Sequence, residues 1–163
     1  MIVLIKTMKK YQLNKEDYIV KKQLHIERLE LDNILALEYF TPNIQFLIDS
    51  FNKEYQWDGM FDIAEVTNRI NTGHILFILY YDNRPIGYVW FKELNETTCF
   101  GYNLYVTKQI ERPIDSPKWF YNKVSGIMLE QYDTIKVEIE DWNKIVFDLV
   151  ESIGYKKDEI NNL

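Results

Sequence analysis

The chain has 163 residues, 47% of them hydrophobic, and a formal net charge of −6. This length and composition predict one folded domain over residues 1–163 and exclude a chain too polar to fold. The acidic balance makes nucleic acid an unexpected partner, because phosphate contacts need a basic surface. No apolar run in the sequence is long enough to cross a membrane, so no membrane partner is expected.

Cysteine and histidine are scarce in this sequence. Cys99 is the only cysteine, which excludes an intrachain disulfide and favours a reducing, cytoplasmic compartment. It lies in a predicted strand and is expected to be a small buried apolar residue. His25 and His74 lie far apart without metal-ligand spacing, so no metal site is predicted.

The first half of the chain is predicted to be mainly helical after a strand. Residues 2–5 predict either a short strand or an added sheet edge, and residues 23–31 contain the first strand proper. Helical periodicity then predicts three helices over residues 31–39, 43–55 and 61–71. The first of them is expected to end before Pro42, because the residue before a proline avoids helical dihedrals.

The middle of the chain predicts three antiparallel strands. Residues 74–81 are an apolar run typical of a strand that is buried on both faces. Turn residues separate it from a second strand at 86–92, in which Gly87 indicates a bulge or a close backbone approach. A third strand over 98–106 is expected to present Phe100, Tyr102, Leu104 and Val106 on one face.

The last part of the chain predicts a helix, a strand and a second helix. Ser116 is expected to cap a helix that has Pro117 at its first position. This crossover helix makes the strands around Leu104 and Val137 parallel neighbours, and we expect them to diverge at their carboxyl ends. Val137 and Ile139 alternate with glutamates, as in a half-buried strand. Asn143 can cap the next helix, and Gly154 is expected to end it. The apolar stripe of that helix is predicted to comprise Ile145, Val146, Leu149, Val150 and Ile153.

The strand with Val137 and Ile139, then Asn143, then the pair Gly154-Tyr155, resembles the last conserved block of the Gcn5-related N-acetyltransferases, the GNAT family. Residues 74–106 resemble the central strands of the same family, so the resemblance covers roughly the last ninety residues. It implies an α/β (α+β) domain of GNAT type, with a mixed, mostly antiparallel sheet and helices on both faces.

The resemblance also implies a site for acetyl-CoA between the third of the three middle strands and the strand after the crossover. The pantetheine arm would pair with backbone of Leu104, Tyr105, Val106 and Thr107. The pyrophosphate would lie on N–H groups of a glycine-rich loop that opens the next helix, as anions do at helix N-termini. Ser116 and Asn143 complete the predicted cofactor-binding set.

The loop at residues 108–117 lacks the family pattern Gln/Arg-x-x-Gly-x-Gly/Ala. One register places Arg112 and Ile114 at the glycine positions, and the other places Ile114 and Ser116 there. Pro113 and Pro117 remove two N–H donors, so acetyl-CoA is expected to bind weakly. Arg112 or Lys118 could contact phosphate instead, or remain ordinary solvated charges.

The catalytic residues stay unassigned at this stage. The tyrosine that many family members use to protonate the leaving thiolate corresponds to Val150 here. Glu138 and Glu140 lie on the strand where a general base could stand, although surface carboxylates are the better default.

Two functions follow from the resemblance. One is an acyl-CoA-dependent N-acetyltransferase, with a small-molecule or protein amine as its acceptor. The other is a catalytically degenerate protein of the same fold that acts as a structural or interaction module, with a protein partner or a second copy. Acceptor-side aromatic residues would either line a groove or form a core; they are Tyr39, Phe40, Phe51, Tyr55, Trp57 and Phe61.

Overall fold

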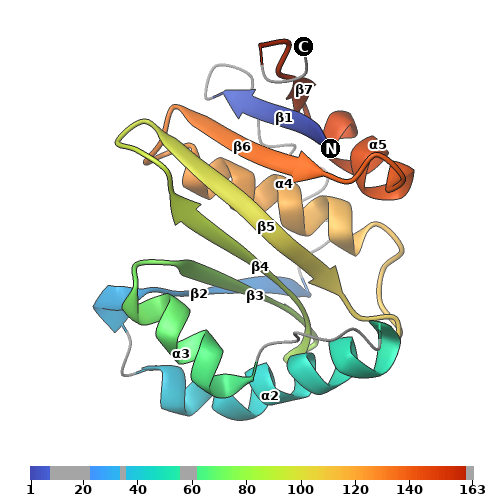
Figure 1. Ribbon diagram of the computed structural model, residues 1–163. Helices are drawn as coiled ribbons and strands as arrows, with labels where there is room; N and C mark the ends of the chain where they lie inside the picture. Colours follow the sequence, from blue (N-terminus) through green and yellow to red (C-terminus); the bar gives the residue numbers. More distant parts are fainter. Residues whose placement is uncertain (8–22, 34–35, 56–61, 161–163) are drawn as a thin grey trace.

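A seven-stranded sheet is the centre of the computed structural model, which describes residues 1–7, 23–33, 36–55 and 62–160 (Figure 1). The strands are β1 (Ile2–Thr7), β2 (Leu24–Leu29), β3 (Ile75–Tyr81), β4 (Arg84–Glu93), β5 (Thr98–Val106), β6 (Thr134–Ile139) and β7 (Lys156–Lys157). The helices are the 3-10 turn η2 (Leu31–Asn33), α2 (Ala36–Tyr55), α3 (Ile63–Asn71), α4 (Ser116–Met128) and α5 (Lys144–Ser152).

The strand order is β2-β3-β4-β5-β6-β1-β7. Every neighbouring pair is antiparallel except β5 and β6, which are parallel. Helix α4 connects these two strands as the crossover that a parallel pair requires. The N-terminal strand β1 lies between β6 and β7, so the two ends of the described chain are joined in one sheet. The predicted mixed, mostly antiparallel sheet is confirmed.

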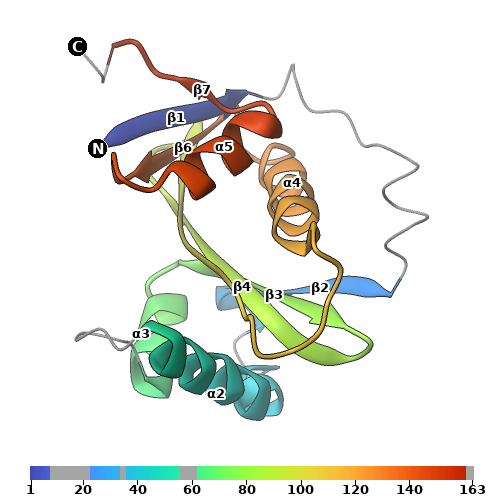
Figure 2. The ribbon, with the colours of Figure 1, turned by 90° about the vertical axis from the view of Figure 1, so that its right-hand side faces the viewer.

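Helices cover both faces of the sheet, as Figure 2 shows. Helices α4 and α5 pack on one face in a cluster that includes Phe77 and Leu79 of β3. Helices α2 and α3 pack on the other face, where Leu76 and Ile78 of the same strand point. Because successive side chains of a strand alternate in direction, the apolar run of β3 supplies both cores. This confirms the prediction of a strand buried on both faces.

The prediction of a helix end before Pro42 is wrong, since α2 continues through this proline. Leu37 and Ile44, one on each side of it, are both buried, so one apolar stripe runs along the whole helix. Burial of that stripe outweighs the backbone hydrogen bond that proline cannot donate. No helix among the described segments is both long and apolar enough to span a membrane.

The ends of α5 agree with the capping predictions, and α3 has a side-chain cap that the sequence analysis did not include. The backbone N–H of Glu65 donates to Asp62 at the start of α3 (2.9 Å), and that of Val146 donates to Asn143 at the start of α5 (3.3 Å). Gly154 ends α5 with a φ of +101°, a left-handed conformation that glycine adopts without strain. One expected stripe residue of α5 is wrong: Ile145 is 84% exposed, while Val150 and Ile153 are buried.

Candidate functional site

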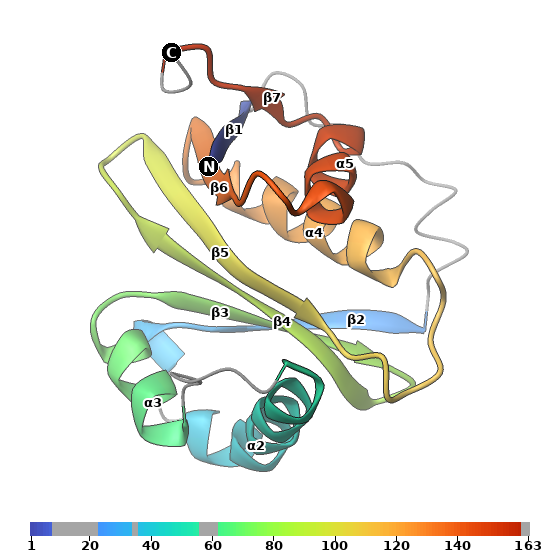
Figure 3. The same cartoon turned by 45° about the vertical axis from the view of Figure 1, so that its right-hand side comes forward.

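Strands β5 and β6 pair only at their beginnings. The paired residues are Thr98 with Thr134, Cys99 with Ile135, and Phe100 with Lys136. Beyond them the strands part (Figure 3). A cavity of about 70 Å³ lies between them. We call this cavity the wedge; it is lined by residues 101–104 of β5, residues 137–139 of β6, Tyr121 of α4, and Val146 and Val150 of α5. Adjacent, parallel and diverging strands agree with the predicted geometry.

A bulge in β5 forms the wall of the wedge. Asn103 has a φ of +54°, and the register of β5 against β4 shifts between the Tyr88–Tyr105 and Trp90–Tyr102 pairs. The extra residue reverses the direction of every following side chain. Tyr102 therefore contacts the core beneath α2 and α3, whereas Leu104 contacts the core beneath α4 and α5. The prediction of one face for Phe100, Tyr102, Leu104 and Val106 is wrong for this reason.

The narrow end of the wedge is closed by a tyrosine against a glycine. A Cβ atom placed on Gly101 would lie 2.6 Å from the hydroxyl oxygen of Tyr121 and 2.9 Å from Cε1 of Phe91. Only glycine lets the phenol approach the strand this closely. Tyr121 is buried, and it shares a hydrogen bond with the hydroxyl of Tyr155. The hydroxyls of Tyr155 and Ser125 are 2.7 Å apart, so three hydroxyl groups form one buried row.

The loop after β5 is held by bonds within the protein. The N–H of Thr107 donates to the carbonyl oxygen of Ile86 (2.7 Å), and its own carbonyl accepts Nε of Arg112 (3.0 Å). The N–H of Lys108 donates to the carboxylate of Glu54 (2.8 Å), at the end of α2. The Arg112 guanidinium is partly buried, which lowers its pKa. These donors are engaged before any ligand arrives.

The start of α4 differs by one residue from the prediction. Asp115 occupies the cap position without a side-chain capping bond, and Ser116 is the first helical residue. The backbone N–H and the hydroxyl of Ser116 both donate to the carbonyl of Pro113, at 3.0 and 2.5 Å. The prediction that Ser116 caps the helix is therefore wrong, because its hydroxyl bonds backward to the loop instead of forward to the helix. Pro117 supplies no N–H, so this helix start offers few free donors.

Solved structures resemble this fold at low sequence identity. An aminoglycoside acetyltransferase from an uncultured soil metagenomic sample, in complex with sisomicin, is 17% identical with a TM-score of 0.61, over 83% of this chain and 90% of that one. A probable acetyltransferase is 14% identical with a TM-score of 0.64, over 83% and 91%. A C-terminal domain of a putative lysylphosphatidylglycerol synthetase from Agrobacterium fabrum is 10% identical with a TM-score of 0.63, over 92% and 50%. No protein-family model and no curated protein matches the sequence.

The chain has the GNAT fold. The strand arrangement carries this conclusion together with the structural neighbours, because β5, α4 and β6 form the parallel crossover expected from the sequence. Identities of 10–17% establish the fold and leave the specific activity open.

The predicted cofactor residues of this GNAT fold are only partly brought together. Leu104 lines the wedge, and Val106 packs on the same side of the sheet. Tyr105 points into the opposite core, so only its backbone is available to a ligand between the strands. Asn143 caps α5 and is not among the residues that line the cavity.

Two residues at the wedge bear on acid–base chemistry. Val150, at the position of the family tyrosine, lines the wedge with an aliphatic side chain. Glu138 lines it too, while Glu140 does not.

Tyr121 was not identified from the sequence. Its contact with Gly101 depends on how the crossover helix packs on β5, which no local sequence signal gives.

Among the described acceptor-side aromatic residues, Phe40 and Phe51 are partly buried against the core beneath α2 and α3, while Tyr39 and Tyr55 are exposed. The rings of Phe51, Tyr55 and Tyr105 pack with centroids 4.7–6.1 Å apart. Tyr39 is 80% exposed. Trp57 and Phe61 lie outside the described residues. Burial raises the pKa of Tyr55 above its ordinary value, so its hydroxyl stays protonated near neutral pH.

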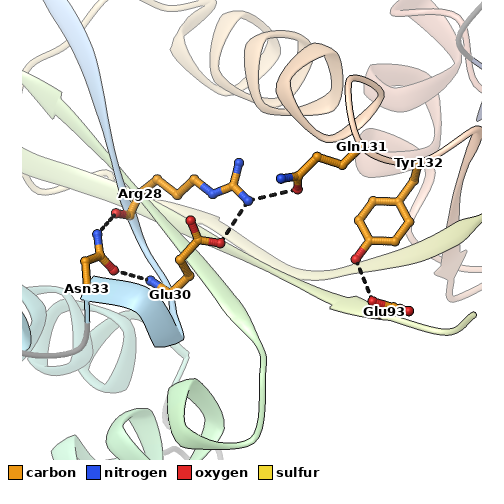
Figure 4. Close-up of polar contacts among 6 residues, drawn as sticks. All are labelled: Arg28, Glu30, Asn33, Glu93, Gln131 and Tyr132. Carbon is orange, nitrogen blue, oxygen red and sulfur yellow. Dashed lines mark hydrogen bonds and ion pairs between the residues drawn. The ribbon is translucent and has the colours of Figure 1, made fainter. Parts of the chain in front are cut away.

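A larger hollow of about 550 Å³ lies away from the wedge, near the start of β3 and the end of β4. Its polar groups bond with one another, as Figure 4 shows. Arg28 donates to Glu30 and to Gln131, both at 2.9 Å, and Tyr132 donates to Glu93 at 2.9 Å. Across the described residues, no group of His, Cys, Asp and Glu side chains is arranged to hold a metal ion.

Proposed function

We propose that this protein is an N-acyltransferase that moves an acyl group from acyl-CoA to an amine. The observation that carries the proposal is the parting of β5 and β6 after Phe100 and Lys136. It leaves the backbone of β5 at residues 101–106 without a strand partner on that side. An extended thioester arm could add to this edge as a further strand does, with main-chain hydrogen bonds to Leu104, Tyr105 and Val106.

The reaction would be direct attack of the amine nitrogen on the thioester carbonyl. A backbone N–H beside the Asn103 bulge would donate to the carbonyl oxygen, on which negative charge develops during the attack. The bulge suits this role, because it disrupts the regular ladder to β4 at the residues that face the wedge.

The donor would be held weakly at its phosphate end. The N–H groups of Lys108 and Ser116 already donate to Glu54 and Pro113, and two prolines lack the donor altogether. Each hydrogen bond to a charged group contributes roughly 1.5–3 kcal/mol, so two missing bonds cost about 3–6 kcal/mol. That loss changes a micromolar site into a roughly millimolar one.

The acceptor we propose is a small-molecule amine. The support is that a structural neighbour of nearly the same length was crystallised with the aminoglycoside sisomicin. The alternative acceptor is an amine of a protein. A panel of sisomicin, spermidine, free lysine and a lysine-containing peptide would separate small-molecule from protein acceptors.

Thermal unfolding with acetyl-CoA tests the donor site. At about 5 mM ligand and a dissociation constant of about 1 mM, the stabilisation is about 1 kcal/mol. For a chain of this size that raises Tm by roughly 2–4 °C. Val146→Phe should abolish the shift, because Val146 lines the wedge, whereas Ile145→Phe on the exposed side of α5 should keep it. Equal shifts in both variants would contradict binding in the wedge.

The second candidate is a GNAT-fold interaction module without catalysis. The engaged donors of the loop favour it, since Glu54 and Pro113 already accept from the N–H groups of Lys108 and Ser116 that a phosphate would use. No thermal shift with acetyl-CoA, CoA or longer acyl-CoAs, together with no acyl transfer to the amine panel, would decide for this candidate.

A further inference from the structure

The narrow end of the wedge lies where the acyl group of a bound donor would end. With the thioester arm along residues 104–106 of β5 and its carbonyl at the Asn103 bulge, the acyl group continues towards Gly101. At that point β5 and β6 come together, and Tyr121 of α4 closes the space between them. A Cβ atom on Gly101 would lie 2.6 Å from the phenol oxygen, so no gap remains between the two residues. The phenol of Tyr121 therefore faces the far end of the acyl group.

Tyr121 is fixed by contacts around its ring and its hydroxyl. Its ring stacks on that of Phe91 with centroids 6.2 Å apart, and it packs against the ring of Tyr155 at 5.6 Å. Its hydroxyl shares a hydrogen bond with that of Tyr155, which in turn is 2.7 Å from the hydroxyl of Ser125. All of these neighbours are buried. Because protein interiors are close-packed, the phenol cannot swing aside for a longer chain without displacing them.

The length of β5 between the bulge and this wall decides how many carbons fit. Asn103 and Gly101 are two strand residues apart, which corresponds to about 7 Å. Carbon atoms in contact stay about 3.5–4 Å apart, so about 3 Å remains beyond the carbonyl carbon. Since a single carbon–carbon bond spans about 1.5 Å, this length holds one or two further carbons. The cavity of about 70 Å³ agrees with a small occupant.

We propose that Tyr121 sets the acyl specificity of the transferase and restricts the donor to acetyl-CoA and propionyl-CoA. This inference rests on the proposed transferase function. The phenol acts by contact alone: the end of a butyryl or longer group would overlap its oxygen atom. In a close-fitting pocket, one methylene group changes kcat/KM by about 10–200-fold, so the exclusion is large enough to measure.

Donors that differ only in acyl length test the proposal. Turnover would be measured with acetyl-, propionyl-, butyryl- and hexanoyl-CoA, using n-butylamine as the acceptor. For wild type we expect kcat/KM with butyryl-CoA to be at least about tenfold below that with acetyl-CoA, and with hexanoyl-CoA at least about 100-fold below it. Tyr121→Leu replaces the phenol with a shorter apolar side chain. The ratio of kcat/KM with hexanoyl-CoA to that with acetyl-CoA should then rise by about tenfold or more.

Two further variants complete the comparison. Tyr121→Phe removes only the phenol oxygen and keeps the ring that packs against Phe91 and Tyr155. It should raise the ratio of kcat/KM with butyryl-CoA to that with acetyl-CoA by about tenfold, and it provides the test alone if Tyr121→Leu fails to fold, as judged by thermal unfolding. Tyr132→Leu is the matched control, because it makes the same replacement at the distant hollow and should leave every ratio unchanged.

The outcomes are distinguishable. Equal kcat/KM with acetyl-CoA and hexanoyl-CoA in wild type overturns the role of Tyr121, and so do ratios that neither variant at this position changes. Either result leaves the transferase function standing, because turnover itself is observed. Absence of turnover by wild type with every donor, combined with no thermal shift by acetyl-CoA, overturns the proposed function and this inference together.

Discussion

Asn143 caps α5 through a single side-chain bond to the N–H of Val146, at 3.3 Å. Replacement by alanine removes the acceptor and leaves that N–H dependent on water. We therefore expect Asn143→Ala to lower the free energy of unfolding by about 1 kcal/mol, the usual value of a lost cap. Urea denaturation at neutral pH measures it. An unchanged midpoint would show that the bond contributes nothing to stability.

Gly101 and Tyr121 should be energetically coupled, because the hydroxyl of Tyr121 fills the space that a side chain at position 101 would need. The 2.6 Å approach predicts that Gly101→Ala costs about 1–3 kcal/mol, through overpacking. In the Tyr121→Phe background the same change should cost less by about 1 kcal/mol, since the closest atom is gone. A residual cost remains from Phe91, 2.9 Å away. Additive effects in this double-mutant cycle would contradict the close contact between Gly101 and the Tyr121 hydroxyl.

Strand β5 depends on its bulge, and the bulge depends on one left-handed residue. Asparagine tolerates the φ of +54° at position 103, whereas a β-branched residue is strained there. Asn103→Val should therefore lower the free energy of unfolding by about 1–3 kcal/mol. Asn103→Gly is the matched control and should be neutral or slightly stabilising. Chemical denaturation of the three proteins gives the comparison, and equal stability of the valine and glycine variants would contradict a bulge at this position.

The existence of elements was predictable where the chain carries a strong local pattern, whereas irregularities set by distant packing were not. The alternation of Val137 with Ile139 and the cap at Asn143 are local signals, and both agree with the structure. The bulge at Asn103 and the passage of α2 through Pro42 are set by packing against distant strands, which overrides local preference. Tyr121 belongs to the same group, because its place in the wedge comes from the contact of α4 with β5. The divergence of β5 and β6 followed from the crossover and the resemblance together.

At the scale of the whole molecule, a buried lysine joins the first strand to the C-terminal part. Lys6 of β1 is buried, donates to Asn122 of α4 (3.2 Å), and lies over the ring of Tyr155. Burial lowers its pKa to about 8, below the ordinary 10.5. Above about pH 8 the unfolded chain therefore binds more protons at this lysine than the folded chain does. The free energy of unfolding then rises as the pH increases towards 10.5, because the folded protein holds the lysine uncharged.

A matched variant isolates this effect. The stability of wild type relative to Lys6→Met should rise by about 2 kcal/mol between about pH 7 and pH 9.5, from the shift in pKa between the two states. Denaturant unfolding of both proteins at the two pH values provides the measurement. If the difference in free energy between them stays constant with pH, the lysine does not lose its proton more easily in the folded protein.

The central claim is that the wedge between β5 and β6 binds an acyl-CoA arm while the loop at residues 108–117 holds its phosphates poorly. Calorimetric titration of the purified protein with acetyl-CoA tests both parts at once. We predict a dissociation constant in the millimolar range, because about two phosphate hydrogen bonds are missing. A value in the low micromolar range would contradict the weak phosphate site, and the absence of binding at several times about 1 mM would contradict the donor site itself.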